Sequence, residues 1–437
     1  MGATPTHPTV TLRSGLVAAL RPLDPAAPYR AAWGALGRTA FAANPFYEAD
    51  YALAAAPAFG EGVRLLLVAD RPPEAAGARI LALWPFRRPR ARWGLPLGVL
   101  MGWTHGFSAL GVPLLAGDAP ERALAGLLAA PKALGLPPRL LMPSLPQEGP
   151  FADHLTGHLT GPLAGHATQA GLRRANYWPY ARALLDLGGC APAARAAFLD
   201  HMPGKRRRKL RQLLTRLEAD GPVTLETARA PAALPAALTE ALEDYIALEG
   251  AGWKGRAGTA ITDRPAEIAF MRDMVAALGT EGRIRIDRLR RGSRTHAAAI
   301  LPITGAGPAG REAWWLKIAH DEAEARNSPG VQLVHRLTQA ILADPSLARA
   351  DSCAGADYRL AEMFWTGRRR LAHVLDRGGG RRSPVPPRDR PGAGAGAGRA
   401  DQGRAPRGRG LSPAPGRRGD LSAAARGRGR PPGRRPR

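Results

Sequence analysis

Cysteine and lysine are both scarce in this sequence. Only two cysteines, Cys190 and Cys353, occur among 437 residues, which excludes a disulfide framework and a cysteine-based zinc site. Only five of the 62 basic residues are lysine. With abundant Ala, Gly and Pro, this bias indicates a GC-rich, bacterial genome rather than a nucleic-acid-binding surface. We expect a reducing, cytoplasmic location, because the N-terminus also lacks the apolar run of a secretory signal.

Large apolar residues are nearly absent from the last part of the chain. Residues 377–437 contain 15 Gly, 10 Pro and 17 Arg but three Asp, so they carry +14 of the net charge of +26. Such a segment cannot bury enough surface to offset the entropy of ordering. We expect a disordered tail after a folded part that suits two domains. An Arg-Gly arm that binds RNA is an alternative for the tail.

An uninterrupted hydrophobic run is also missing. The segment 94–117 has 24 residues without a charge, which is long enough to cross a membrane. It contains six glycines, Pro96, Pro113 and His105, however. Broken runs of this kind favour buried strands and turns, so we expect no membrane span.

The second half has a clear order of predicted elements. Three strands in a row with short turns must be antiparallel, and a helix then leads to a strand parallel to the last of them. This order, β-α-α-β-β-β-α-β-α, is that of the GNAT acyltransferase fold. The elements are a strand at 223–227, helices at 234–249 and 265–278, strands at 283–289, 296–303 and 312–319, a helix at 328–343, a strand at 348–353 and a helix at 358–375.

The first half predicts a similar order, so we expect an α/β fold with mixed sheets in which two GNAT-like domains follow each other. The predicted boundaries are 1–165, 166–376 and the tail 377–437. The elements are strands at 10–13, 63–69, 78–86, 97–103 and 139–145, helices at 26–39, 46–55, 120–134 and 151–159, and two added strands at 166–176 and 180–187.

A helix start after the third antiparallel strand is the candidate donor site. Ser328 is a strong N-cap, Pro329 fits the first helical position, and Gly330 lets a ligand approach the backbone. The free N–H groups there, including that of Val331, and the positive end of the helix dipole would hold a phosphate, with Arg326 adding charge. The alternative is that Ser-Pro-Gly is simply a good helix start.

Ionisable groups concentrate where the third strand ends. Acyl transfer needs a base for the attacking group and polarisation of the carbonyl, and Asp321 or His320 could be that base. Lys317 alternates onto one face with Trp315 and Ala319, where it could pair with a phosphate or a carboxylate. Salt bridges and exposed loop positions are the alternative for each of these residues.

Two further segments are candidates. In a GNAT-like fold the third antiparallel strand and the next strand, here the fifth, splay apart and leave a gap. Asp351 ends the fifth strand, faces this gap and is a further catalytic candidate, whereas Cys353 is best explained as a buried thiol. The loop that follows Glu249 offers Trp253, Lys254 and Arg256 for stacking on a sugar ring and for reaching anionic groups of an acceptor. A tryptophan that anchors the loop on the core is the alternative.

The run 205–211 is the densest group of positive charge in the folded part. Leucines follow at helical spacing, which favours an amphipathic helix with a solvated basic face over an RNA contact.

Taken together, several motifs resemble one known family. They are Lys205–Leu217, Leu248-Glu249, Gly252-Trp253-Lys254-Gly255-Arg256, Gly258-Thr259, Lys317-Ile318-Ala319-His320-Asp321-Glu322, Ser328-Pro329-Gly330-Val331, Asp351-Ser352-Cys353-Ala354, and Trp365 with Arg368 and Arg369. Over residues 170–375 the chain is similar to the BioF2-like acetyltransferase domain of the GNAT superfamily, found in CelD-like cellulose-biosynthesis proteins. The resemblance implies a cytoplasmic, acetyl-CoA-dependent acyltransferase without a metal that acts on a polysaccharide, its precursor or another small acceptor. It also implies kinship with FemABX-type proteins, which use tandem GNAT folds.

Two departures leave alternatives open. The pyrophosphate signature of ordinary GNAT enzymes is replaced by Ser328-Pro329-Gly330, and His320 stands where an aromatic residue is expected. An aminoacyl-tRNA-dependent transferase and a non-catalytic subunit of a polysaccharide-synthesis complex are therefore alternatives. The tRNA would be the only nucleic-acid partner among these possibilities.

Overall fold

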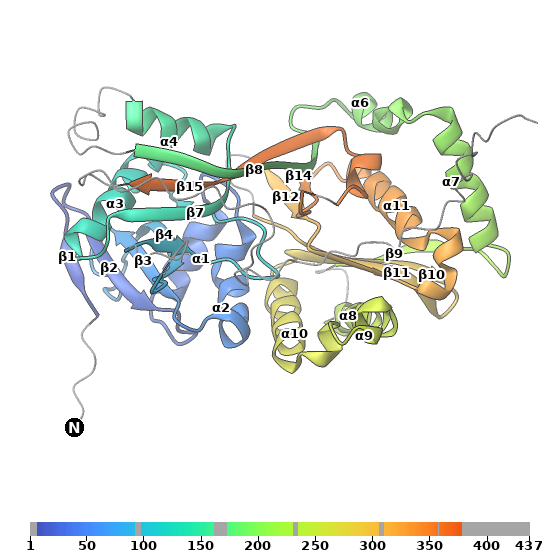
Figure 1. The fold of residues 1–437 in the computed structure, drawn as a ribbon, viewed down its shortest axis with the longest axis horizontal. Helices are drawn as coiled ribbons and strands as arrows, with labels where there is room; N and C mark the ends of the chain where they lie inside the picture. Colours follow the sequence, from blue (N-terminus) through green and yellow to red (C-terminus); the bar gives the residue numbers. More distant parts are fainter. Residues whose placement is uncertain are drawn as a thin grey trace, which may run out of the picture. The chain divides into compact units, whose positions relative to one another are not determined.

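The computed structural model describes residues 7–91, 98–160, 173–229, 235–305, 310–356 and 358–377 (Figure 1). Helices alternate with strands through both halves, and parallel and antiparallel pairs occur in the same sheet, which confirms the predicted fold class. Within the described ranges, the strands form one sheet of 11 strands and one of 4 strands. The predicted tail lies outside the described residues, apart from Arg377.

The elements of the first half lie close to their predicted positions. Strands at 17–22 and 114–115 were not predicted, and the predicted strand at 166–176 lies mostly outside the described residues. The elements are β1 (Thr9–Thr11), β2 (Val17–Pro22), α1 (Arg30–Arg38), η1 (Pro45–Tyr47), α2 (Ala49–Phe59), β3 (Arg64–Ala69), β4 (Ile80–Arg87), β5 (Leu100–Gly102), β6 (Leu114–Leu115), α3 (Pro120–Ala133), β7 (Arg139–Pro146), α4 (Pro150–Thr160) and β8 (Arg173–Asp186).

The second half follows the predicted order as far as its fifth strand. Its elements are α6 (Pro192–Ala196), η2 (Phe198–His201), α7 (Gly204–Leu217), β9 (Thr224–Arg229), α8 (Pro235–Ala251), α9 (Trp253–Arg256), η3 (Ile261–Asp263), α10 (Pro265–Thr280), β10 (Ile284–Arg291), β11 (Arg294–Pro302), β12 (Arg311–Trp314), β13 (Lys317–His320), η4 (Glu322–Asn327), α11 (Pro329–Ala343), β14 (Leu347–Asp351), η5 (Ala361–Met363) and β15 (Gly367–Arg377).

The predicted helix at 358–375 is wrong. Residues 367–377 form β15, which lies between β7 and β8 and pairs antiparallel with both. A register shift near His373 breaks the alternation that would have indicated a strand. Pairing with distant strands overrides local propensity here. Because β15 joins a sheet that begins in the first half, both halves belong to one compact unit, and the domain boundary near residue 165 stays a prediction.

The two halves repeat one arrangement of strands. In the first half β4 is followed by β5, β6, α3 and β7, and β5 pairs parallel with β7. In the second half β11 is followed by β12, β13, α11 and β14, and β12 pairs parallel with β14. In each half, therefore, the strand that follows the helix pairs with β5 or β12, and not with β6 or β13, the strand directly before the helix.

Two apolar cores enclose the four-stranded sheet of β13, β11, β10 and β9. Helices α8 and α10 cover one face, whereas α11 covers the other (Figure 1). The core beneath α8 and α10 continues into the first half, where Phe46 packs on Trp314 with ring centroids 5.7 Å apart. Burial of these large rings is a main source of stability at this junction.

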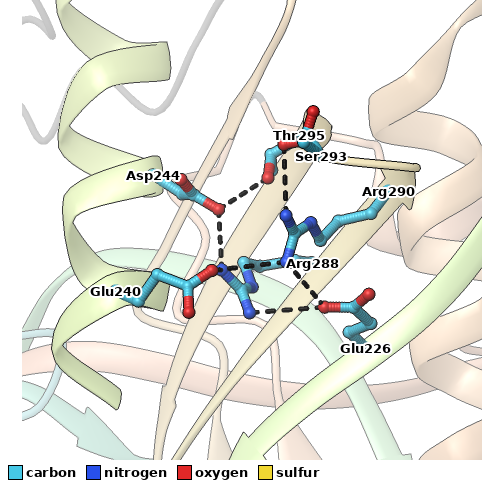
Figure 2. Close-up of polar contacts among 7 residues, drawn as sticks. All are labelled: Glu226, Glu240, Asp244, Arg288, Arg290, Ser293 and Thr295. Carbon is cyan, nitrogen blue, oxygen red and sulfur yellow. Dashed lines mark hydrogen bonds and ion pairs between the residues drawn. The ribbon is translucent and has the colours of Figure 1, made fainter. Parts of the chain in front are cut away.

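A charged network fixes α8 on the sheet (Figure 2). The guanidinium of Arg288 on β10 donates to Glu240 and Asp244 of α8 at 2.8 Å each, and to Glu226 of β9 at 3.3 Å. Thr295 also donates to Asp244, at 2.6 Å. Hydrogen bonds to Arg288, followed by its charge, lower the pKa of Glu240. The network therefore sets the position of the helix whose C-terminal end carries Glu249.

Replacing Arg288 by Met is expected to destabilise the protein by about 1–3 kcal/mol at neutral pH, since three carboxylates then lack their shared cation. Because the pKa of Glu240 is lowered in the folded protein, its contribution is present above the ordinary value of 4.5 and is lost as the pH falls through the lowered value. Urea unfolding at several pH values measures both effects. The control is Arg272→Met, which breaks an exposed pair with Glu243 and should change stability little.

Candidate active site

A bulge interrupts the strand that β12 and β13 form along β11. Ala313 bridges to Ile303, and Lys317 pairs with Ile300. The N–H of Leu316 also donates to Ile300 O, at 2.9 Å. Leu316 and Lys317 thus face one residue of β11, which defines a β-bulge and turns their side chains to the same face.

The bulge corrects the predicted position of Lys317. Trp315 packs against Trp365, with ring centroids 5.8 Å apart, in the core covered by α11. The ammonium of Lys317 lies 4.2 Å from the ring centroid of Phe107, in the opposite core, which also contains Ala319. Lys317 therefore shares a face with Ala319, as predicted, but not with Trp315.

Beyond the bulge one edge of β13 has no partner strand among the described residues. Trp315 N–H still donates to Asp351 O of β14 at 2.8 Å, but β13 is the terminal strand of its own sheet. Asp321 N–H donates to His296 O of β11 at 2.8 Å. Since amides alternate in direction along an antiparallel strand, those of Ile318 and His320 point to the open edge.

A cavity lies at this open edge. Its lining residues include Lys254 and Lys317 from one face and Trp315 and Tyr358 from the other, together with Leu316 and Ile318. Burial raises the pKa of Tyr358, so its hydroxyl is protonated at neutral pH. Tyr358 was not predicted as a site residue, because the sequence placed it at the start of an expected helix.

Lys317 is a half-buried lysine in an environment that disfavours its charge. Burial first, and then the nearby charge of Lys254, lower the pKa of Lys317 to about 8. Its Nζ donates to Gly106 O of the first half at 3.3 Å, and the Phe107 ring lies beside it. A lysine with this pKa exchanges protons near physiological pH, as general bases do.

Glu249 and Lys254 form a buried pair next to Lys317. Lys254 Nζ donates to Glu249 Oε1 at 2.6 Å, and Tyr245 OH donates to the same oxygen at 3.1 Å. Ile261 N–H donates to Glu249 Oε2 at 3.0 Å. Although burial opposes ionisation, Lys254 and these hydrogen bonds hold the pKa of Glu249 below its usual value. The structure therefore brings together the predicted Glu249, Lys254 and Lys317.

Glu322 holds the short helix α9 beside this pair. Its Oε1 accepts the Trp253 N–H at 2.6 Å, and its carboxylate forms an ion pair with Arg256. Trp253 and Arg256 thus lie on the element that also carries Lys254, as the sequence predicted. Glu322 belongs to a motif that carries the family resemblance, but the sequence alone did not indicate that it fixes this helix.

Gly255→Ala is expected to displace α9. A Cβ at Gly255 would overlap the carbonyl oxygen of Gly250, which is backbone and cannot turn away. We expect a loss of about 1–3 kcal/mol and weaker acceptor binding, because Trp253 and Lys254 move with the helix. Thermal unfolding and acceptor KM measure these effects. Gly204→Ala in α7 is the control, since a Cβ there meets no atom within 4 Å; equal behaviour of the two variants would contradict this account of α9.

The start of α11 differs in detail from the prediction. Ser328 has a left-handed backbone, with φ of 53°, and its side chain makes no capping hydrogen bond. Its carbonyl instead accepts the Val331 N–H at 3.0 Å. A Cβ on Gly330 would lie 3.5 Å from Nδ1 of His320, so that ring borders the helix start. Arg326 is exposed just before the helix.

The three predicted catalytic residues, Asp321, His320 and Asp351, are not among the residues that line the cavity. Asp321 accepts from Arg294 at 2.6 Å and from the Ala323 N–H at 2.9 Å. His320 is half-buried, and burial lowers its pKa, so its imidazole is neutral at neutral pH.

Asp351 is fully buried in an ion network. Its carboxylate pairs with Arg182 at 2.7 Å and with Arg369 at 2.8 Å, and it accepts the Cys353 N–H at 2.7 Å. These contacts join β14 to β8 and β15. The side chain therefore holds the strands that border the cavity and has no oxygen left without a partner.

Two kinds of feature are absent from the part of the chain that the structure describes. No group of three or more His, Cys, Asp or Glu residues is placed to bind a metal ion. None of the helices there combines the length and apolar character needed to cross a membrane.

Comparisons with known proteins bear on the identity of this site. Residues 204–359 match the family model described as an acetyltransferase (GNAT) domain. No curated protein is significantly similar to the chain.

Three solved structures are among the similar folds. A conserved protein of unknown function from Bacteroides thetaiotaomicron is 10% identical over 85% of this chain and 99% of its own, with a TM-score of 0.47. A tandem GNAT protein from the clavulanic acid biosynthesis pathway is 13% identical over 84% and 100%, with a TM-score of 0.38. The C-terminal domain of a putative lysylphosphatidylglycerol synthetase from Agrobacterium fabrum is 14% identical over 68% and 82%, with a TM-score of 0.39. These likenesses are distant and carry no argument about function.

The matched residues contain α7 to α11, the interrupted strand and the cavity-lining Tyr358. The second half of this chain thus contains a GNAT-type acetyltransferase domain, and the protein is an acyltransferase enzyme.

Proposed function

We propose that the enzyme transfers an acetyl group from acetyl-CoA to an amine or hydroxyl of a small acceptor, such as a saccharide or a polysaccharide precursor. The observation that carries this proposal is the open edge of β13. There the Ile318 amide has no partner among the described strands and lies beside a cavity whose lining includes Lys254, Lys317 and Tyr358. A fixed N–H donor of this kind stabilises the negative oxygen that develops when a thioester is attacked.

The donor would lie along β13 and the start of α11. Its carbonyl oxygen would accept from the Ile318 amide, and its diphosphate would lie at Ser328 and Gly330, near Arg326. A Cβ at Gly330 would make ordinary contact with the His320 ring, so this ring lies at the first turn and would border the diphosphate. Val331 would act only through its position in the first turn.

The acceptor would enter from the side of α8 and α9. Trp253 and Arg256 would contact its outer part, and Lys254, held by Glu249, would face the reacting group. The acceptor nitrogen or oxygen attacks the thioester carbon and passes a proton to neutral Lys317, the carbon–sulfur bond then breaks, and Tyr358 gives its proton to the departing thiolate. In this scheme Asp321 and Asp351 position strands, while His320 borders the donor.

A thiol-release assay tests the proposed function. Purified protein is incubated with acetyl-CoA and a panel of amino sugars, nucleotide sugars and small amines, and free CoA is measured. Acceptor-dependent release that is lost in Lys317→Met supports the proposal. Absence of release with every acceptor, in a folded protein, would count against acetyl-CoA as the donor.

An aminoacyl-tRNA donor is a second candidate, favoured by one observation. Helix α7 exposes Lys205, Arg208, Lys209 and Arg211 while it buries Leu210, as the sequence predicted for an amphipathic helix. The helix packs on η4 and α11, next to the proposed donor site. A tRNA held by this face would dissociate steeply with added salt. Charged-tRNA binding that ignores salt, or no binding at all, would remove this candidate.

A further inference from the structure

We propose that the first half has no acyl-donor site of its own, and that its residues 103–113, the first-half excursion, hold Lys317 in place at the second-half cavity and thereby govern acceptor binding. The identity of the cavity rests on the proposed function. The absence of a first-half donor site concerns the described residues of that half.

The excursion occupies the place that the bulge has in the second half. β5 and β6 both pair antiparallel with β4, as β12 and β13 both lie along β11. In the second half the interruption is Trp315 and Leu316, whereas in the first half it is residues 103–113. β6, the first-half counterpart of the open-edged strand β13, is therefore preceded by a long piece of chain.

That piece of chain packs against β7, where the first half would otherwise be open. A Cβ on Gly111 would overlap the carbonyl oxygen of Pro143, and a Cβ on Gly102 would lie 2.8 Å from Pro143 Cδ. The excursion at Gly111, and β5 just before the excursion, thus touch the strand that corresponds to β14. A thioester has no room between β6 and β7, the counterparts of β13 and β14, while the excursion lies there.

Side chains from both halves hold the excursion in place. Three donors come from the start of the first half: Tyr47 donates to Trp103 O, Tyr51 to Phe107 O and Asn44 to Val112 O. Lys317 of the second half donates to Gly106 O, and Arg182 of β8 donates to Ala109 O. Five oxygens of one short segment are thus fixed, which gives a rigid surface rather than a free loop.

Two of these contacts lead directly to the second-half site. Lys317, which donates to Gly106 O at 3.3 Å, lines the cavity. Arg182, which donates to Ala109 O at 2.8 Å, is bound to Asp351 at the end of β14. Phe107 also packs on Phe270 of α10, with ring centroids 5.2 Å apart. The excursion therefore sets the position of Lys317, the cavity residue that contacts the first half.

Donor stoichiometry tests the first part of the inference. The full chain is titrated by calorimetry with a non-hydrolysable acetyl-CoA thioether. We expect one molecule per chain, and no binding in Gly330→Trp, whose folding is checked by its unfolding midpoint. Two molecules per chain, or one molecule that still binds folded Gly330→Trp, would overturn the inference. No binding to the unchanged chain would instead contradict the proposed donor, and the lysine measurement below then decides the inference.

Phe107→Leu tests the second part, with Phe86→Leu as the control. Phe86 is equally buried in the first half but stacks on Trp84, away from Lys317. Phe107→Leu should raise acceptor KM about tenfold and leave donor KM unchanged, since it removes the ring beside which Lys317 is held at the acceptor side of the cavity. It should also raise the rate at which an amine reagent modifies Lys317, measured by peptide mass spectrometry. The inference would be overturned if Phe107→Leu and Phe86→Leu, both folded, had equal effects on the rate of Lys317 modification and on acceptor KM.

Discussion

Ile318→Pro is expected to lower kcat about 100- to 1,000-fold while stability changes little. The substitution removes one N–H group, which the alternation of β13 directs to the open edge rather than to β11. Proline is tolerated in an edge strand when its missing N–H faces away from the ladder. Loss of a single donor to a developing oxyanion has a cost of this size. Thiol release and urea unfolding measure the two effects.

Ala319→Pro is the matched contrast. The amide of Ala319 points to β11, so proline there removes a ladder hydrogen bond and should lower stability well below that of Ile318→Pro. A normal kcat in Ile318→Pro, or a greater loss of stability than in Ala319→Pro, would contradict the assigned direction of these amides.

Lys317→Met is expected to lower kcat about 100- to 10,000-fold and to make the protein more stable. The loss of rate follows from removal of the proposed base. The gain in stability follows because burial penalises the protonated amine, whose pKa is lowered to about 8. We expect the free energy of unfolding to rise by about 1–2 kcal/mol at neutral pH. A lower rate together with a higher stability is typical when a residue that serves function is replaced.

The pH dependence of Lys317→Met follows from the sign of this shift. In the unchanged protein the penalty is complete below pH 8 and is relieved as the pH rises from about 8 toward the ordinary lysine value of 10.5. The stability difference between the two proteins should therefore shrink in that range. The kcat of the unchanged enzyme should rise with an apparent pKa of about 8. A destabilised Lys317→Met, or a flat rate profile, would contradict the proposed role of Lys317.

Hydrophobic periodicity and turn signals in the sequence predicted most of the helices and strands. The order of elements from residue 223 to residue 351 was predictable, because the segment 283–289 alternates, the segment 296–303 is a short apolar run between turn signals, and helix α11 begins with a clear signal at Ser328-Pro329-Gly330. The strand β15 was not predictable, because its partners β7 and β8 lie far away in the sequence. Such pairing leaves no local pattern.

The candidate site was predictable only in part. Glu249, Lys254 and Lys317 were each found from residue type, but the bulge that turns Lys317 toward Phe107 depends on backbone pairing with Ile300. Asp351 was expected at the gap, and its two arginine partners on β8 and β15 could not be foreseen. The sequence also contained no sign that the first half contacts the site. That contact joins Gly106 and Lys317, which are separated by 211 residues.

A crystal structure of the full chain with a non-hydrolysable acetyl-CoA analogue tests the central claim most directly. The account predicts a carbonyl oxygen within hydrogen-bonding distance of the Ile318 amide and a diphosphate at the first turn of α11. An analogue bound elsewhere in the chain, or one whose carbonyl leaves that amide without a partner, would contradict it.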